Sequence, residues 1–189
     1  RNTADFNITP YLQKGKNTVA AEVYRSSDGS FLEAQDMFRL PGIFRTVALY
    51  SVPKVHFRDL VATPDLDATY TDGSLTVNAE IRNLGKKAIK DYKVYYSLYA
   101  NKLYSDENTL VDGFLSPVID KIAPNETGSV QTVLKVKAPN KWSAEFPYRY
   151  TLVAELKDKK NKTIEMVSTI VGFRKVEIKD TPASEDEFG

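Results

Sequence analysis

The sequence contains no cysteine, a single histidine and no apolar run long enough to span a bilayer. The absence of cysteine excludes a disulfide framework and a thiolate metal site. A membrane-spanning helix needs about 20 consecutive apolar residues, so no membrane partner is expected. The 26 basic and 25 acidic side chains leave a formal charge of +1. Since no basic stripe stands out, nucleic acid is also not an expected partner.

What the chain does contain is enough apolar surface for a packed core. It is 42% hydrophobic and 11% aromatic over 189 residues, which fits one large domain or one domain plus part of another. The N-terminus begins at Arg1 and carries no signal-peptide pattern. We therefore expect a piece of a longer protein. A chain without cysteine is equally compatible with the bacterial cytoplasm and the periplasm, so the compartment is left open.

Alternation of apolar and polar residues predicts β-strands along most of the chain. Residues 75–82 have a period of two, as a strand with one solvated face requires. The other predicted strands, separated by turn sequences rich in Gly, Asn, Asp and Pro, cover residues 55–62, 92–99, 130–136, 150–156 and 163–178. The stretch 110–117 is interpreted as an ordinary strand and turn. About seven strands at this spacing predict an all-β fold, a β-sandwich over residues 53–179.

Residues 1–52 form a separate unit in this interpretation. Residues 17–25 and 44–52 are both predicted to be strands, and Pro53 falls where a central strand could not continue. About fifty residues with two strands bury too little surface to fold alone. We therefore expect this unit to be the end of a larger β-domain. Residues 180–189 are polar and acidic, which is typical of a linker.

The densest segment of the first unit is Phe31 to Arg45. It carries three phenylalanines, two arginines and a Pro-Gly break, with Asp36 near its centre. Large apolar residues in a non-repetitive stretch indicate a packed loop, and packed loops often hold function. From these residues alone, we expect the Asp36 side chain to cap the loop or to pair with Arg39 or Arg45.

Three blocks of sequence together resemble the family 2 β-galactosidases. The first comprises Asp5-Phe-Asn-Ile-Thr-Pro-Tyr-Leu12, Gly15-Lys-Asn-Thr-Val19, Gln35-Asp-Met-Phe-Arg39 and Gly42-Ile-Phe-Arg45. The second is Trp142-Ser-Ala-Glu-Phe-Pro147, and the third is Val171-Gly-Phe-Arg-Lys-Val-Glu-Ile178. The chain departs from the family pattern at Ser26 and Phe38, where tryptophan is common, and at Pro41, where a small residue is usual. These departures leave the exact substrate open.

The resemblance implies the C-terminal strands of a jelly-roll sugar-binding domain, then an immunoglobulin-like β-sandwich, then a linker toward a TIM barrel. Family members are retaining glycosidases that use two carboxyl groups about 5 Å apart. Neither motif of the catalytic glutamates occurs here, so this portion alone is expected to be inactive, and no catalytic residue is assigned. By the same resemblance, magnesium belongs to the barrel and the parent enzyme is a homo-oligomer acting on galactosides.

The same resemblance assigns two roles to Asp36, namely a ligand of a sodium ion and a contact to a galactose hydroxyl. A carboxylate is a hard oxygen ligand, so the chemistry is reasonable. Glu33 and Glu145 match no catalytic motif and are not interpreted as an acid pair. The alternatives are another family 2 glycosidase, such as a β-glucuronidase or β-mannosidase, and a stand-alone carbohydrate-binding sandwich.

Overall fold

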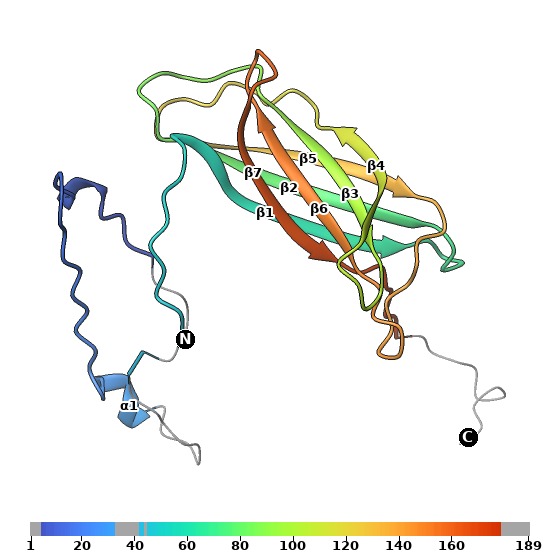
Figure 1. The fold of residues 1–189 in the computed structure, drawn as a ribbon, viewed down its shortest axis with the longest axis horizontal. Helices are drawn as coiled ribbons and strands as arrows, with labels where there is room; N and C mark the ends of the chain where they lie inside the picture. The colour runs from blue at the N-terminus through green and yellow to red at the C-terminus, as the bar shows by residue number, and fades with distance from the viewer. Residues whose placement is uncertain (1–4, 33–41, 44, 179–189) are drawn as a thin grey trace. The chain divides into compact units, whose positions relative to one another are not determined.

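The computed structural model describes residues 5–32, 42–43 and 45–178. The chain divides into two units, Arg1–Tyr50 and Ser51–Gly189. In the described part of the first unit, the helical segments are a 3-10 turn, η1 (Thr9–Tyr11), and a short helix, α1 (Asp28–Leu32). The second unit contains the strands (Figure 1).

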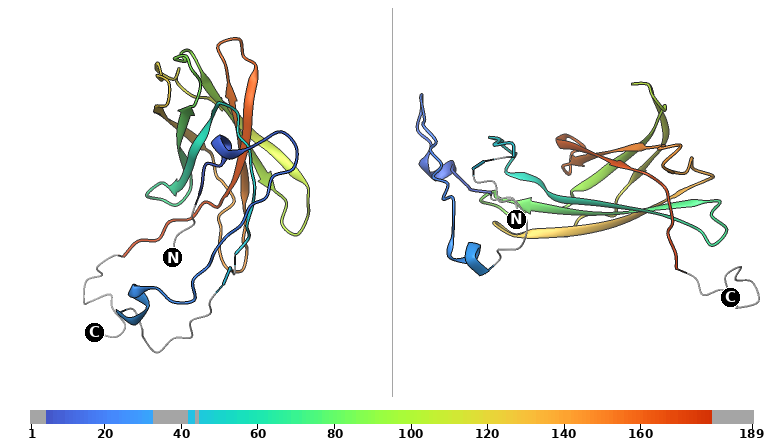
Figure 2. Two further views of the ribbon diagram at one scale, coloured as in Figure 1. Left: turned by 90° about the vertical axis from the view of Figure 1, so that its left-hand side faces the viewer. Right: turned by 90° about the horizontal axis from the view of Figure 1, so that it is seen from below.

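The described part of the second unit, residues 51–178, contains seven strands, which pair antiparallel in two sheets. The strands are β1 (Val55–Leu66), β2 (Gly73–Asn83), β3 (Lys93–Asn101), β4 (Asn108–Leu115), β5 (Thr127–Val136), β6 (Tyr150–Lys157) and β7 (Thr163–Val171). One sheet has the order β1-β2-β5 and the other the order β4-β3-β6-β7. Figure 2 shows the two sheets as separate layers. The sheet of β1, β2 and β5 lies opposite the sheet that contains β3, β6 and β7, which is the arrangement of immunoglobulin sandwiches. Strand β4 extends the second sheet beside β3. The predicted all-β, immunoglobulin-like fold is confirmed.

The core lies between the two sheets and follows the alternation in the sequence. On β2, every second residue from Gly73 to Asn83 is buried and the intervening ones are half-exposed. The side chains with no exposed surface include Leu75, Val77, Ile81, Val94, Tyr96, Leu98, Leu152 and Leu156. Burying one large aliphatic or aromatic side chain contributes about 1.5–3 kcal/mol. This set is therefore sufficient to hold the two sheets together without a disulfide.

An aspartate organises the turn between β1 and β2. Asp67 accepts backbone N–H groups from Thr69, Thr71 and Asp72 at 3.1, 2.8 and 3.2 Å. These hydrogen bonds, that of Thr71 foremost, lower the pKa of the Asp67 carboxyl group. The chain leaves this turn at Gly73, whose missing Cβ matters because a Cβ would lie 2.9 Å from the ring of Phe173. The turn between β1 and β2 is therefore fixed by local hydrogen bonds and close packing.

In the described residues, two predicted strands, 17–25 and 44–52, are wrong, and the strand predicted over residues 163–178 is too long. Residues 17–25, and the described residues of 44–52, form no strand, and nearly all of their side chains are exposed. A strand is stabilised by a ladder partner, and no backbone hydrogen bond joins these segments to another in the described part of the first unit. The last strand ends at Val171 and does not continue to residue 178. Beyond it, Phe173 turns inward and its side chain is fully buried.

Two hydroxyl groups face the core from opposite sheets without hydrogen bonds. Tyr96 on β3 stacks on Phe114 with 4.8 Å between ring centroids. Neither Tyr96 Oη nor Thr132 Oγ1, on β5, has a hydrogen-bond partner among the described residues. Burial raises the pKa of Tyr96 to about 12, and the neighbouring Thr132 hydroxyl opposes this rise only in part. The two oxygens are thus close neighbours that do not meet hydrogen-bond geometry.

We expect Thr132→Val to raise the free energy of unfolding by about 1 kcal/mol, because it removes a buried hydroxyl that has no partner. Urea unfolding followed by circular dichroism measures the change. Thr76→Val, on the outward face of β2, is the control and should change stability by less than about 0.5 kcal/mol. A loss of stability at Thr132 would instead show that its hydroxyl bonds Tyr96 in solution.

Candidate functional site

Asp36 lies in the stretch 33–41, outside the residues that the structure describes. Its predicted roles as a sugar contact and a sodium ligand therefore stay predictions. Arg39 and Phe38 belong to the same stretch. The structure describes how the chain enters this segment and how it leaves it.

The segment begins at a capped helix and ends near a glycine turn. The backbone N–H of Ser27 donates to Ser30 Oγ at 2.9 Å, the back-bond of a capping box at the start of α1. On the far side, Gly42 has φ of +107°, which L-residues with a side chain rarely adopt. The Pro-Gly break seen in the sequence thus coincides with a backbone conformation that favours glycine.

The other residues considered from the sequence form no metal site in the part of the chain that the structure describes. Glu145 is exposed in the connection before β6, while Glu33 lies outside the described residues. His56 is close to the carbonyl of Pro53, with 3.0 Å between Nδ1 and the oxygen, which is a structural contact. Among residues 5–32, 42–43 and 45–178, no three His, Asp or Glu side chains gather in a way that could hold a metal ion.

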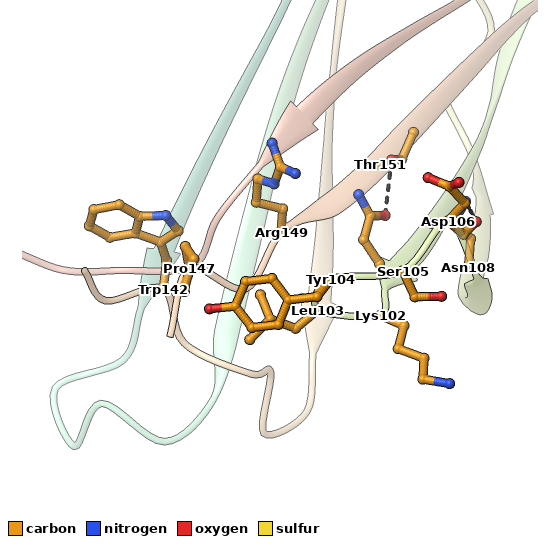
Figure 3. Close-up of a pocket in the computed structure, with 11 residues that line it drawn as sticks. Lys102, Leu103, Tyr104, Ser105, Asp106, Asn108, Trp142, Pro147, Arg149 and Thr151 are labelled. Atoms are coloured by element: carbon orange, nitrogen blue, oxygen red, sulfur yellow. Dashed lines mark hydrogen bonds between the residues drawn. The ribbon is translucent and has the colours of Figure 1, made fainter. Parts of the chain in front are cut away.

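A groove that sequence reasoning missed lies at one end of the sandwich (Figure 3). The turn between β3 and β4 forms one wall and the connection before β6 forms the other. Its volume is about 720 Å³, and its lining includes Asn101, Tyr104, Asp106, Trp142, Arg149 and Thr151. No pattern in the sequence joins Trp142 to Tyr104, since only the fold brings both residues to one groove.

Both units match known protein families. Residues 55–174 match the family described as glycosyl hydrolases family 2. Residues 1–53 match the sugar binding domain of the same family. The chain therefore belongs to glycosyl hydrolases family 2. The recognition made from the three sequence blocks is confirmed, whereas the predicted boundaries at residues 52 and 179 stay predictions.

The curated relatives are long enzymes of which the chain spans a small part. It is 43% identical over 177 residues to a β-galactosidase of Priestia megaterium, which covers 94% of this chain and 16% of that protein. It is 40% identical over 184 residues to a β-galactosidase of Photobacterium profundum. That match covers 95% of this chain and 17% of the relative. The chain thus spans about a sixth of the length of these relatives.

Solved structures support the fold. A β-glucuronidase of Bacteroides uniformis matches 89% of this chain and 20% of its own, with a TM-score of 0.73 and 20% sequence identity. A glycosyl hydrolase family 2 member from Bacteroides cellulosilyticus matches 64% of this chain and 16% of its own, with a TM-score of 0.51 and 20% sequence identity. At such identities the likeness establishes the fold alone. In the part of the chain that the structure describes, no helix is long and apolar enough to cross a membrane.

Proposed function

We propose that the protein containing this chain is a retaining β-galactosidase, which hydrolyses terminal β-D-galactose residues of β-galactosides. The chain is its non-catalytic portion. The observation that carries the proposal is the similarity to proteins named β-galactosidase, at 43% and 40% identity over at least 94% of the chain.

Within that enzyme, the sandwich would act as a rigid spacer. Its two sheets share one core, and the segment after β7 is held back onto the turn between β1 and β2. Lys175 Nζ donates to the carbonyl of Leu66 at 3.1 Å, and Tyr70 Oη donates to Glu177 at 2.7 Å. A segment fixed at several points leaves the domain in a defined direction, which is what positioning an active site requires.

Asp36 is the residue that we assign to the active site. Its carboxylate can coordinate a sodium ion as a hard oxygen ligand, and it can accept a hydrogen bond from a sugar hydroxyl. The support for this role is the Gln35-Asp-Met block and the match of residues 1–53 to the family's sugar binding domain. A bound ion would supply a fixed positive charge beside the sugar, and the protein's part is to hold the carboxylate in place.

The second candidate is another family 2 glycosidase. We consider it because a similar solved structure is named β-glucuronidase. Their identity to this chain is about half that of the β-galactosidases. A panel of nitrophenyl galactoside, glucuronide and mannoside substrates separates the candidates. Turnover of the glucuronide in place of the galactoside would overturn the proposal.

We expect Asp36→Ala in the whole enzyme to lower kcat/KM for a nitrophenyl β-galactoside about 10- to 100-fold, because the substrate ring loses an orienting contact. The difference between rates at low and high sodium should disappear as well. Steady-state kinetics at matched ionic strength measure both effects. Asp5→Ala, an exposed aspartate of the same unit, is the control and should be silent.

The two parts of the proposal fail separately. Absence of galactoside turnover in the unmodified enzyme would overturn the assigned activity. Full turnover with an unchanged sodium dependence in Asp36→Ala would overturn the role of that residue only.

A further inference from the structure

The groove between the β3–β4 turn and the connection before β6 presents an aromatic ring to solvent. Tyr104 is 88% exposed and, among the described residues, makes no hydrogen bond. It is the third residue of a four-residue turn closed by Ser105 N donating to the carbonyl of Lys102 at 3.2 Å. Its φ is +61°, a conformation that turns normally give to glycine or asparagine. Neither packing nor an internal contact explains a tyrosine at this position.

The opposite wall carries Trp142 in a fixed orientation. The guanidinium of Arg174 lies 5.0 Å from the centre of the indole ring. Gly172 allows the close packing, because a Cβ there would lie 3.2 Å from Trp142. A tryptophan held by these contacts loses little conformational freedom when its ring binds a ligand.

Polar side chains also line the groove, and some of their groups have no partner among the described residues (Figure 3). The Arg149 guanidinium forms no ion pair or hydrogen bond within the described part of the chain. Thr151 donates to Asn101 Oδ1 at 3.0 Å, which leaves the Nδ2 donor of Asn101 available. Lys102 is engaged by Glu107 at 2.8 Å, so Arg149 and the acidic Asp106 are the charges left to the groove. They offset each other.

We propose that this groove binds a saccharide. A pyranose ring has a face of C–H groups that can lie on the Tyr104 ring, and a rim of hydroxyls that both donate and accept hydrogen bonds. Arg149 and Asn101 supply donors and Asp106 supplies acceptors. The volume of about 720 Å³ lies in the range of small-molecule sites, and the balanced charge suits a neutral ligand. All of the residues that line the groove belong to the second unit.

The chain carries its own reporter, because Trp142 is its only tryptophan and lines the groove. We expect lactose, titrated into the 189-residue chain, to change tryptophan emission along a saturating curve. Half-saturation is expected on the order of 1 mM, as for a small ligand in an open groove. Tyr104→Ala should raise the half-saturating concentration about tenfold, because it removes the stacking surface.

Two controls make the result decisive. Tyr11→Ala removes a tyrosine of similar exposure, 79%, from the first unit and should leave the curve unchanged. Glycerol, a polyol without a ring, should give no saturating response. A lactose response that is absent, does not saturate, is matched by glycerol or survives Tyr104→Ala would overturn the proposal. Since no turnover is measured, such a failure leaves the assigned activity and Asp36 untouched.

Discussion

Phe173→Ala is expected to lower the free energy of unfolding of the second unit by about 3–5 kcal/mol. The Phe173 side chain has no exposed surface, and its ring meets that of Tyr150 edge to face at 5.2 Å between centroids. Its backbone is also fixed, because the carbonyl of Phe173 accepts the N–H of Trp142 at 2.9 Å. Removal of the ring leaves a cavity. The backbone cannot move to close it, because this hydrogen bond holds the chain in place.

Urea unfolding followed by circular dichroism measures the loss. Val176→Ala is the matched control, because it shortens a side chain of the same segment that is 78% exposed. It should change stability by less than about 0.5 kcal/mol. A loss below about 1 kcal/mol at Phe173 would mean that the segment after β7 is not part of the folded core.

The strands of the sandwich could be predicted because burial and sequence share one period. On β2 from Leu75 to Ile81, and along β6, every second residue is buried and each of these buried residues is apolar. The edge strand β4 was harder to predict, since its side chains are almost all exposed and give no clear alternation. Its position beside β3 depends on pairing with residues 95–101, which local sequence does not encode.

Other features depended on contacts between distant residues and could not be predicted. The apolar pattern of residues 163–178 suggested one strand, yet Phe173 leaves the ladder to fill space above Gly73, about a hundred residues earlier. In the first unit, the sequence has strand character while the described residues form no ladder. Asp36 was assigned through family resemblance, because a single carboxylate in a loop has no pattern of its own.

The side chain of Asn83, at the end of β2, is polar yet fully buried. Its Nδ2 group donates to the carbonyls of Lys87 at 2.9 Å and Ile122 at 3.2 Å, with Ala123 at 3.3 Å. Its Oδ1 accepts the N–H of Gly85 at 2.9 Å. One amide therefore satisfies backbone groups from two connections that are distant in sequence.

We expect Asn83→Leu to lower the free energy of unfolding by about 3 kcal/mol, because it leaves several buried backbone groups without partners. Asn83→Asp should cost about 3–5 kcal/mol at pH 7, since it places a negative charge against carbonyl oxygens. Urea unfolding at pH 7 measures both losses. Asn78→Leu and Asn78→Asp, on the outward face of the same strand, are the controls and should cost less than about 1 kcal/mol.

The pH dependence separates the two Asn83 variants. In Asn83→Asp, burial beside carbonyl oxygens raises the pKa of the new carboxyl group above its value in the unfolded chain. The protonated form is then the one that the fold tolerates, so stability is recovered as the pH falls toward the unfolded pKa and is lost as it rises through the folded one. Asn83→Leu introduces no titrating group, and its loss relative to the unmodified chain should not vary with pH. Equal losses at pH 5 and pH 7 for Asn83→Asp would show that the amide's donors do not hold the two connections together.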